Sequence, residues 1–275
     1  MPVRRAPSIP SDQDPGVSPA PPPSDPDFML SLARGLAVIR AFGEGKPQLS
    51  IREVALATGV SRAAARRCLH TLSTLGYATG ANGVYELTPA TLSLASNYLG
   101  STSIARLAQP ILERVSSQLH ESSSVAVLDG DDIVYVARAA VRRILSIGLA
   151  VGSRLPAPCT SMGRVLIANL DEAARARMLT RLKLTRHTPR TIVDKTEFRA
   201  ELDRIRAQGY AIVDQELELG LRSMAVPIVG AGRRVQAAIN VGVHAGRADR
   251  QTLLREFLPV LQQAAADIGA ALRGA

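Results

Sequence analysis

The hydrophobic residues between positions 28 and 76 recur at the spacing of three consecutive helices. The first helix is indicated by large apolar side chains three or four residues apart: Leu32, Leu36, Ile39 and Phe42. A second helix is predicted over 50–58, because Ser50 and Glu53 have the spacing of a capping box and Gly59 can end the helix. A third is predicted from its N-cap, Ser61, to about position 75.

A short segment of strand pattern follows these helices. Strands are predicted over 77–79 and 84–87, and Asn82-Gly83 between them is a strong signal for a tight hairpin turn. A further helix over 89–99 and a Gly/Ser-rich hinge separate this part of the chain from the rest. We therefore predict a winged helix-turn-helix domain over 28–88 and a linker over 89–102.

The remainder of the chain, 103–275, mixes helical and strand patterns. Strands are predicted near 125–128, 133–138, 144–149, 224–229 and 235–243. Helices are predicted near 104–120, 161–169, 172–181, 197–207 and 250–272, the last one bent at Pro259. Because mainly short turns join the strands, an antiparallel sheet covered by helices is expected, and the fold class is predicted to be α+β.

The first 27 residues differ in composition from everything that follows. They hold nine of the 17 prolines and almost no large apolar residues, so they are predicted to be a disordered tail outside the fold. They lack the apolar run of a signal peptide, and no stretch of the chain is apolar for long enough to cross a bilayer. A cytoplasmic location without membrane contact is expected.

The net charge of +9 and the pI of 10.3 favour a polyanionic partner. An Arg-rich composition would give the same values, since 30 of the 33 basic residues are Arg. The two cysteines form no C-x-x-C pair and the four histidines are scattered, which argues against a disulfide framework and a zinc site. No metal and no cofactor are predicted.

The third predicted helix separates an apolar face from a basic one. Ala65, Cys68, Leu69 and Leu72 fall on the inner face, where Cys68 is interpreted as a small core residue and not a redox sensor. The basic face can enter a major groove and present guanidinium groups to guanine edges or phosphates. The candidate DNA-binding residues are Ser50, Ser61, Arg62, Ala63, Arg66, Arg67, His70 and Thr71. The alternative is a winged helix that contacts proteins, with its arginines merely solvated.

Beyond the tail, almost the whole chain resembles the IclR family of bacterial transcription regulators. The likeness rests on Ser31-Leu32-Ala33-Arg34-Gly35-Leu36 with the helix-turn-helix, on the segment 152–163, and on the segment 209–227. The last two segments are similar to the protocatechuate and p-hydroxybenzoate (Pca/Pob) subgroup, whose members govern aromatic-acid breakdown through the β-ketoadipate route. The resemblance implies a GAF-like effector domain over 103–275, a homodimer or tetramer, and a palindromic operator in double-stranded DNA.

A carboxylate site is predicted where the segment 152–163 runs into a helix. A helix N-terminus offers free N–H groups and a partial positive charge, and Arg154 can add a bidentate partner. We predict that Arg154, Thr160 and Ser161 hold the carboxylate of an aromatic acid, with Cys159 and Met162 beside it. The alternative is that Thr160 or Ser161 only caps the helix and Arg154 faces solvent.

Further effector residues are suggested on later segments. The resemblance places Asp214 and Glu216 at the border of the effector site, whereas a solvated acidic loop paired with Arg222 explains them equally well. Ser223 and Asn240 are placed on strands by their pattern and in the pocket by the resemblance alone.

An enzyme with Cys159 as nucleophile is the least favoured class. Nucleophilic catalysis also needs a base and an orienting group, and none of the four histidines lies in a catalytic motif. The chain is therefore predicted to be a non-enzymatic, DNA-binding transcription regulator that responds to a small aromatic acid and controls aromatic catabolism. The runner-up is a winged-helix interaction module whose sensory domain binds a protein.

Overall fold

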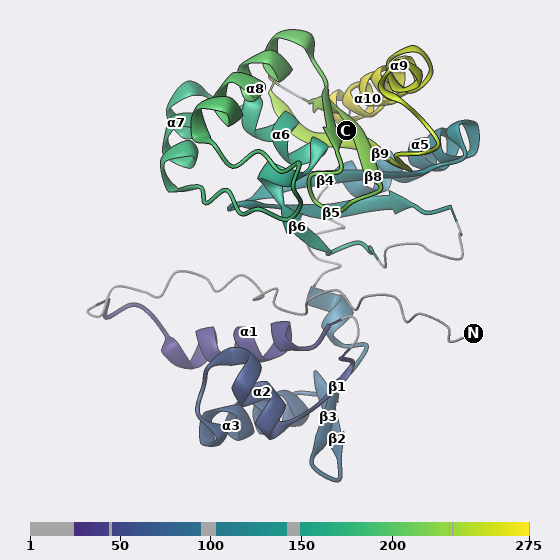
Figure 1. Cartoon of the computed structure of the whole chain (residues 1–275). Coiled ribbons are helices and arrows are strands. Elements are labelled where there is room, and N and C mark those ends of the chain that lie inside the picture. The colour runs from purple at the N-terminus through teal and green to yellow at the C-terminus, as the bar shows by residue number, and fades with distance from the viewer. Residues whose placement is uncertain are drawn as a thin grey trace, which may run out of the picture. The chain divides into compact units, whose positions relative to one another are not determined.

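The chain divides into two compact units, 1–97 and 98–275, which are described separately (Figure 1). The structure is a computed structural model that describes residues 25–43, 46–94, 103–141, 149–230, 232 and 234–274. The division falls inside the predicted linker, 89–102, of which 91–94 are helical and 95–102 lie outside the described residues. The predicted tail also lies outside them, except for its last three residues.

The N-terminal unit is a winged helix-turn-helix, as predicted. Its helices are α1 (Leu30–Ala41), α2 (Ile51–Thr58) and α3 (Arg62–Thr74). Its sheet is antiparallel, with β3 (Val84–Leu87) between β1 (Gln48–Ser50) and β2 (Ala78–Ala81). The three-residue strand β1 was not predicted, because so short a segment shows no alternation. The buried core of this unit is formed by Val38, Leu49, Val54, Ala65, Leu69, Leu72 and Ala78.

The turn between α2 and α3 follows from local sequence. Ser50 caps α2: its hydroxyl accepts a hydrogen bond from the Glu53 N–H at 3.3 Å, and the Glu53 carboxylate accepts one from the Ser50 N–H at 2.8 Å. Gly59 ends α2 with a φ of 68°, a backbone conformation that side chains with a Cβ rarely adopt. Ser61 then caps α3 by accepting a hydrogen bond from the Ala64 N–H at 3.2 Å.

The C-terminal unit is built on a six-stranded antiparallel sheet of order β6-β5-β4-β9-β8-β7, which confirms the predicted α+β class. The strands are β4 (Ser122–Asp129), β5 (Asp132–Ala139), β6 (Arg154–Pro156), β7 (Ala211–Asp214), β8 (Leu221–Val229) and β9 (Val235–His244). A strand was predicted near 144–149. Residues 144–148 of it lie outside the described residues, and residue 149 is not in a strand. The edge strand β6 was not among the predicted strands.

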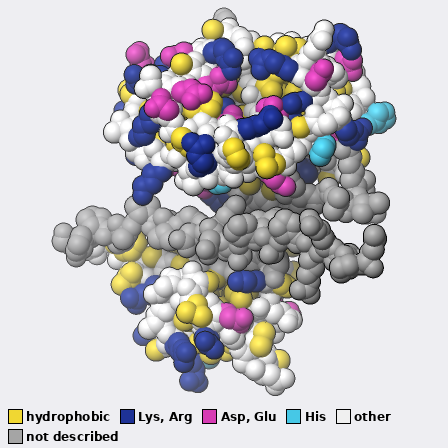
Figure 2. Space-filling model, viewed as in Figure 1, with side chains coloured by type: hydrophobic (Ala, Val, Ile, Leu, Met, Phe, Trp, Pro, Cys, Tyr) yellow, Lys and Arg dark blue, Asp and Glu magenta, His cyan; other side chains and the backbone are white. Residues whose placement is uncertain are grey.

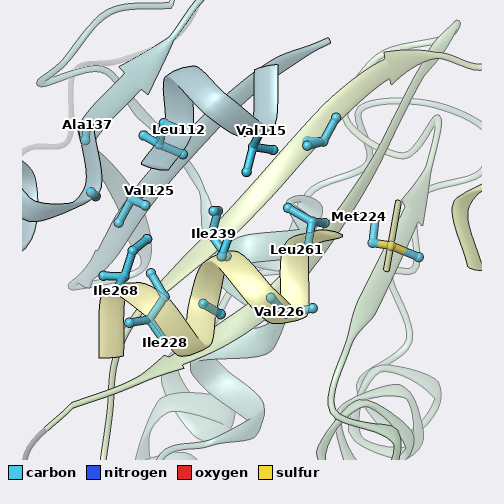
Figure 3. Packing of buried hydrophobic residues seen from close by; sticks show 14 of the residues in the cluster. Leu112, Val115, Val125, Ala137, Met224, Val226, Ile228, Ile239, Leu261 and Ile268 are labelled. Carbon is cyan, nitrogen blue, oxygen red and sulfur yellow. The ribbon is translucent and has the colours of Figure 1, made fainter. Parts of the chain in front are cut away.

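Helices cover both faces of this sheet (Figure 1). On one face, α5 (Ser103–Leu119) and α10 (Leu258–Arg273) enclose the larger core, in which Leu112 and Leu261 pack against Val125 and Ile239 (Figure 3). On the other face lies α6 (Ser161–Ala168), which follows the 3-10 turn η1 (Ala157–Cys159). Behind α6 are α7 (Glu172–Arg181) and α8 (Lys195–Gln208). No described helix is long and apolar enough to cross a membrane.

The C-terminal helical segment is interrupted, not simply bent. It consists of α9 (Arg250–Thr252), a π-helical turn over Leu253–Phe257, and α10. Pro259 sits in the first turn of α10, because it has no N–H to donate and its ring crowds the carbonyl four residues earlier. The preceding turn takes up this mismatch by widening to the π form.

Strand β4 sends adjacent serines to opposite faces of the sheet. The Ser123 hydroxyl donates to the Leu112 carbonyl of α5 at 2.9 Å and lies 2.8 Å from the Ser116 hydroxyl. The Ser124 hydroxyl accepts a hydrogen bond from the Arg138 guanidinium at 3.0 Å. Because neighbouring side chains of a strand point to opposite faces, Ser124 and Arg138 lie on the α6 face.

Candidate DNA interface and effector site

The outer face of α3 is exposed and basic. Ser61, Arg62, Ala63, Arg66, Arg67, His70 and Thr71 are all exposed, whereas Ala65, Leu69 and Leu72 of the same helix are buried. Figure 2 shows basic side chains gathered at the lower left, where Figure 1 places α3. The 3.6-residue period of the helix produces this division, since each buried residue is three or four positions from the next.

The arginines of this face have no ion-pair partner among the residues that the structure describes. None of the ion pairs in the described part of the chain includes Arg62, Arg66 or Arg67. The predicted hydroxyls, by contrast, have local partners: Ser50 and Ser61 are helix caps, and Thr71 donates to the Arg67 carbonyl at 2.9 Å. The guanidinium groups are therefore the part of this face that is available to phosphates and base edges.

The hairpin of β2 and β3 forms the wing. Asn82 and Gly83 at its tip have φ angles of 54° and 78°, as a tight primed turn requires. Gly80 faces the Tyr85 ring so closely that a Cβ on it would lie 2.6 Å from a ring carbon. The Tyr85 ring can therefore pack against position 80 only because that residue is a glycine.

On the α6 face of the large sheet, Arg138 of β5 is a cation without a carboxylate partner among the described residues. None of the ion pairs in the described residues includes it, and its Nε is buried with no hydrogen-bond partner there. Burial lowers the pKa of this guanidinium, and the nearby Tyr135 phenol opposes the change. An arginine nevertheless stays charged near neutral pH, so Arg138 presents an unneutralised cation to this face.

Further polar groups lie on the same face. Asn240 of β9 pairs in register with Ser124 of β4, and its Oδ1 is buried without a hydrogen-bond partner among the described residues. The Ser161 hydroxyl, at the start of α6, is fully buried and equally unpartnered in that part of the chain. Burial raises the pKa of Tyr135 to about 12, so its phenol remains a hydrogen-bond donor at neutral pH. Buried polar atoms without partners are rare and are often satisfied by a ligand or water.

The predicted carboxylate residues have different surroundings. Arg154 lies on the edge strand β6, where Asp129 and Asp132 hold its guanidinium at 2.6 and 3.2 Å. Thr160 is the N-cap of α6 and accepts a hydrogen bond from the Gly163 N–H at 3.1 Å. Ser161 and Met162 are buried on the first turn of α6. The structure thus brings Thr160, Ser161 and Met162 together and leaves Arg154 engaged elsewhere.

Cys159 is buried in η1 beside this turn. Burial raises the pKa of its thiol to about 11, with the Arg164 charge lowering it and the Glu216 charge raising it by less. A nucleophilic cysteine must ionise readily, so this environment opposes the chemistry of a cysteine-dependent enzyme. The described residues contain no group of His, Cys, Asp and Glu that could hold a metal ion.

The effector candidates Asp214, Glu216 and Ser223 have three different environments. Asp214 is bound by Arg222 at 2.9 Å and by Arg190 at 3.0 Å, as the alternative interpretation of this loop expects. Ser223 of β8 shares the α6 face, because it alternates with Met224, whose side chain belongs to the core under α5 and α10. Glu216 is buried and binds Arg164.

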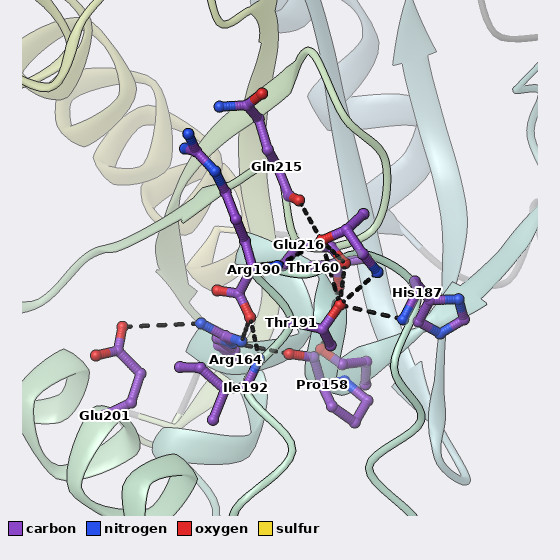
Figure 4. Close-up of polar contacts among 12 residues, drawn as sticks. Pro158, Thr160, Arg164, His187, Arg190, Thr191, Ile192, Glu201, Gln215 and Glu216 are labelled. Atoms are coloured by element: carbon purple, nitrogen blue, oxygen red, sulfur yellow. Dashed lines mark hydrogen bonds and ion pairs between the residues drawn. The ribbon is translucent and has the colours of Figure 1, made fainter.

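Arg164 of α6 is the largest fully buried side chain among the described residues, and no sequence argument identified it (Figure 4). Its guanidinium donates to the Pro158 carbonyl at 2.7 Å and to the Glu216 carboxylate at 2.5 Å, and it lies 4.0 Å from Glu201. The Phe198 ring lies 5.5 Å from the guanidinium carbon. The sequence did contain a signal for this residue, because it places an arginine inside an otherwise apolar helix. A buried cation needs a partner, so such a position indicates a buried ion pair.

An exposed basic recognition helix joined in one chain to a domain with unsatisfied buried polar groups defines a DNA-binding regulator with a ligand-sensing domain. Residues 31–80 match the IclR helix-turn-helix domain, and residues 96–270 match the C-terminal domain of the bacterial transcriptional regulator IclR. The chain belongs to the IclR family of bacterial transcriptional regulators.

Two of the following relatives extend over both units, and the third matches one domain. The Pca regulon regulatory protein of Pseudomonas putida is 52% identical over 245 residues, which cover 89% of this chain and 84% of the relative. A Rhodococcus sp. RHA1 protein of known structure is 46% identical, with a TM-score of 0.79, over 89% of this chain and 98% of that one. A double mutant of the PobR inducer-binding domain from Acinetobacter, in complex with 3-hydroxybenzoic acid, is 33% identical, with a TM-score of 0.57, over 60% of this chain and 96% of that one.

Proposed function

We propose that this regulator senses a small aromatic carboxylate held between α6 and the sheet, with Arg138 pairing the carboxylate. The observation that carries the proposal is a partly buried guanidinium without any carboxylate partner in the described residues, hydrogen-bonded only to the neutral Ser124. A bound carboxylate supplies the missing charge and accepts from the free Nε–H. Arg154 is already neutralised by two aspartates, so the carboxylate is assigned to Arg138 in its place.

The remaining polar groups of this face suit the ring hydroxyl of an aromatic acid. Ser161 can donate to such a hydroxyl, and the free Asn240 Oδ1 can accept from it. Met162 and Ala126, both buried in the core of this face, offer apolar contacts to the ring. The PobR domain complex with 3-hydroxybenzoic acid and the Pca regulon regulatory protein support an aromatic acid as the effector class.

The proposed target is a palindromic operator in double-stranded DNA, bound in the cytoplasm by a homodimer or tetramer. Arg62, Arg66 and Arg67 would contact phosphates and base edges in the major groove, and the wing would lie along the adjacent backbone. Two copies of the helix are needed because a palindrome presents two half-sites. The protein would act by binding, and the raised pKa of the buried Cys159 thiol argues against that residue as a nucleophile.

Calorimetric titration of the full chain with 3-hydroxybenzoate, 4-hydroxybenzoate and protocatechuate tests the effector. At least one acid should bind, and its methyl ester should bind at least tenfold more weakly, because the ester cannot pair with Arg138. If acid and ester bind equally, or if none of these acids binds, the proposal of an aromatic carboxylate is wrong.

Gel shifts with the DNA upstream of the chain's own gene test the other half of the proposal. A regulator should select one site and lose affinity steeply with added salt. A winged-helix protein-interaction module would instead show only weak binding that does not depend on sequence.

A further inference from the structure

One side chain of α6 binds both the preceding turn η1 and a segment that is distant in the sequence. Arg164 reaches back from α6 to the Pro158 carbonyl in η1, two residues before the cap Thr160. Its other arm binds Glu216, which follows β7 by two residues and lies 52 positions away in sequence. Figure 4 shows Arg164 among these partners.

Glu216 extends the connection to a third segment, the strap over 183–194 between α7 and α8. Its carboxylate accepts a hydrogen bond from the Ile192 N–H at 2.9 Å, and its carbonyl accepts from the Thr191 hydroxyl at 2.6 Å. Thr188 also donates, to the Gln215 carbonyl at 2.7 Å. One ion pair therefore holds η1, the strap and the loop after β7 against the start of α6.

The ion pair is fully desolvated, which makes its removal different from the loss of a surface contact. Arg164 is 1% exposed and Glu216 is 7% exposed. Without Arg164, Glu216 would be a buried carboxylate held only by the Ile192 N–H, and it would have to gain a proton or move toward water. Either response loosens the contact between η1 and the loop, and with it the position of Thr160 and Ser161.

We infer that Arg164 is a positioning residue of the effector site, which holds the first turn of α6 in register with the sheet without touching the effector. This inference rests on the proposed function. Glu216, predicted from the sequence to bind the effector, is assigned here the role of partner to Arg164. Loss of the ion pair should weaken effector binding more than it weakens the fold or DNA binding.

The test compares effector affinity by calorimetry in the full chain with its melting temperature and its operator affinity without effector. Arg164→Met should weaken binding of the best aromatic acid at least tenfold, and Glu216→Gln should do so in the same direction. Arg164→Lys keeps the charge and should stay within about threefold of the wild type. Arg175→Met is the matched control, because Arg175 is also mostly buried and paired, with Asp203, but touches neither η1 nor Glu216.

Each outcome decides the inference. It is supported if Arg164→Met and Glu216→Gln lose effector affinity, Arg164→Lys restores it, and all variants keep the operator affinity of the wild type. It is overturned if Arg164→Met loses less than tenfold in affinity for the acid, or if Arg175→Met loses as much affinity. Should Arg164→Met fail to fold, Glu216→Gln, in which a neutral amide replaces the carboxylate, decides alone. A wild-type protein that binds no aromatic acid would instead overturn the proposed function.

Discussion

Arg138 and Arg154 lie on the neighbouring strands β5 and β6 and have opposite electrostatic situations. Arg154 is exposed and shared by two aspartates, whereas the partly buried Arg138 guanidinium is bonded, among the described residues, only to a serine. Exposed, already paired charges contribute little to recognition, while a desolvated cation gains most from a new anion. The sequence offered no means to tell them apart, because burial and partners decide the difference.

The first prediction concerns these two residues. Arg138→Gln should weaken aromatic-acid binding at least about tenfold, in line with the ~1.5–3 kcal/mol of a hydrogen bond to a charged group. Its melting temperature should not fall, because an unpaired cation is removed from a partly buried place. Arg154→Gln, measured in parallel by calorimetry, should leave the affinity within twofold; a larger loss for Arg154→Gln than for Arg138→Gln would contradict the assignment.

A second prediction concerns the two thiols. Burial raises the pKa of Cys159 to about 11, so its thiol is neutral and enclosed at pH 8, whereas Cys68 is only partly buried. Iodoacetamide at pH 8 should therefore label Cys68 first and Cys159 only after unfolding, as peptide mass spectrometry can show. Rapid labelling of Cys159 in the native protein would count against its burial in η1.

The raised pKa of the Cys159 thiol also predicts how the free energy of unfolding changes with pH. The folded thiol keeps its proton to higher pH than the unfolded one, so this contribution to the free energy of unfolding is complete below pH 9. It is lost as the pH rises from 9.0 to about 11.

At the scale of elements, the join between η1 and α6 depends on a glycine. A Cβ on Gly163 would lie 2.1 Å from the Ala157 carbonyl oxygen and 2.4 Å from the Ala157 Cα, both backbone atoms that cannot rotate away. The helix can approach η1 this closely only because position 163 has no side chain. The sequence motif contained this glycine, but only the structure gives the reason for it.

Gly163→Ala should accordingly push η1 away from α6. We expect a loss of roughly 1–3 kcal/mol in the free energy of unfolding of the C-terminal unit, as in other overpacked cores. Denaturant titration of the full chain measures it. Gly35→Ala in α1 is the control of opposite sign: a Cβ there meets nothing within 4 Å, so alanine should stabilise the helix by about 0.5–1 kcal/mol. Equal effects of both substitutions would contradict the steric argument.

The helices and long strands could be predicted from the sequence because caps and periodicity mark them locally. Ser50, Ser61 and the α10 proline are such signals, whereas β1 and β6 are three-residue strands that exist only through their neighbours. The effector site was harder, because β5 contains a bulge. Val125 pairs with Ala137 but Ala126 pairs with Tyr135, so Val136 is an extra residue. Simple alternation from Tyr135 would turn Arg138 to the α5 face, and the bulge returns it to the α6 face.

At the scale of the whole molecule, a basic face that binds DNA must release counterions. The logarithm of operator affinity should fall linearly with the logarithm of salt concentration, with a slope of about 0.9 per phosphate contact. Arg66→Ala should reduce that slope by roughly one contact, measured by fluorescence anisotropy across a salt series. Arg255→Ala removes an equal charge from the C-terminal unit and should leave the slope unchanged; an identical change in both variants would indicate a net-charge effect.

The two adjacent serines of β4 connect the two faces of the large sheet through hydrogen bonds. On one face, the Ser124 hydroxyl accepts a hydrogen bond from Arg138. On the other face, the hydroxyl of the preceding residue, Ser123, is hydrogen-bonded to the Leu112 carbonyl and the Ser116 hydroxyl of α5. Helix α5 begins at Ser103, immediately after the predicted linker. A carboxylate paired with Arg138 would therefore be connected to α5, the first helix after the predicted linker, through the hydrogen bonds of two neighbouring residues of one strand.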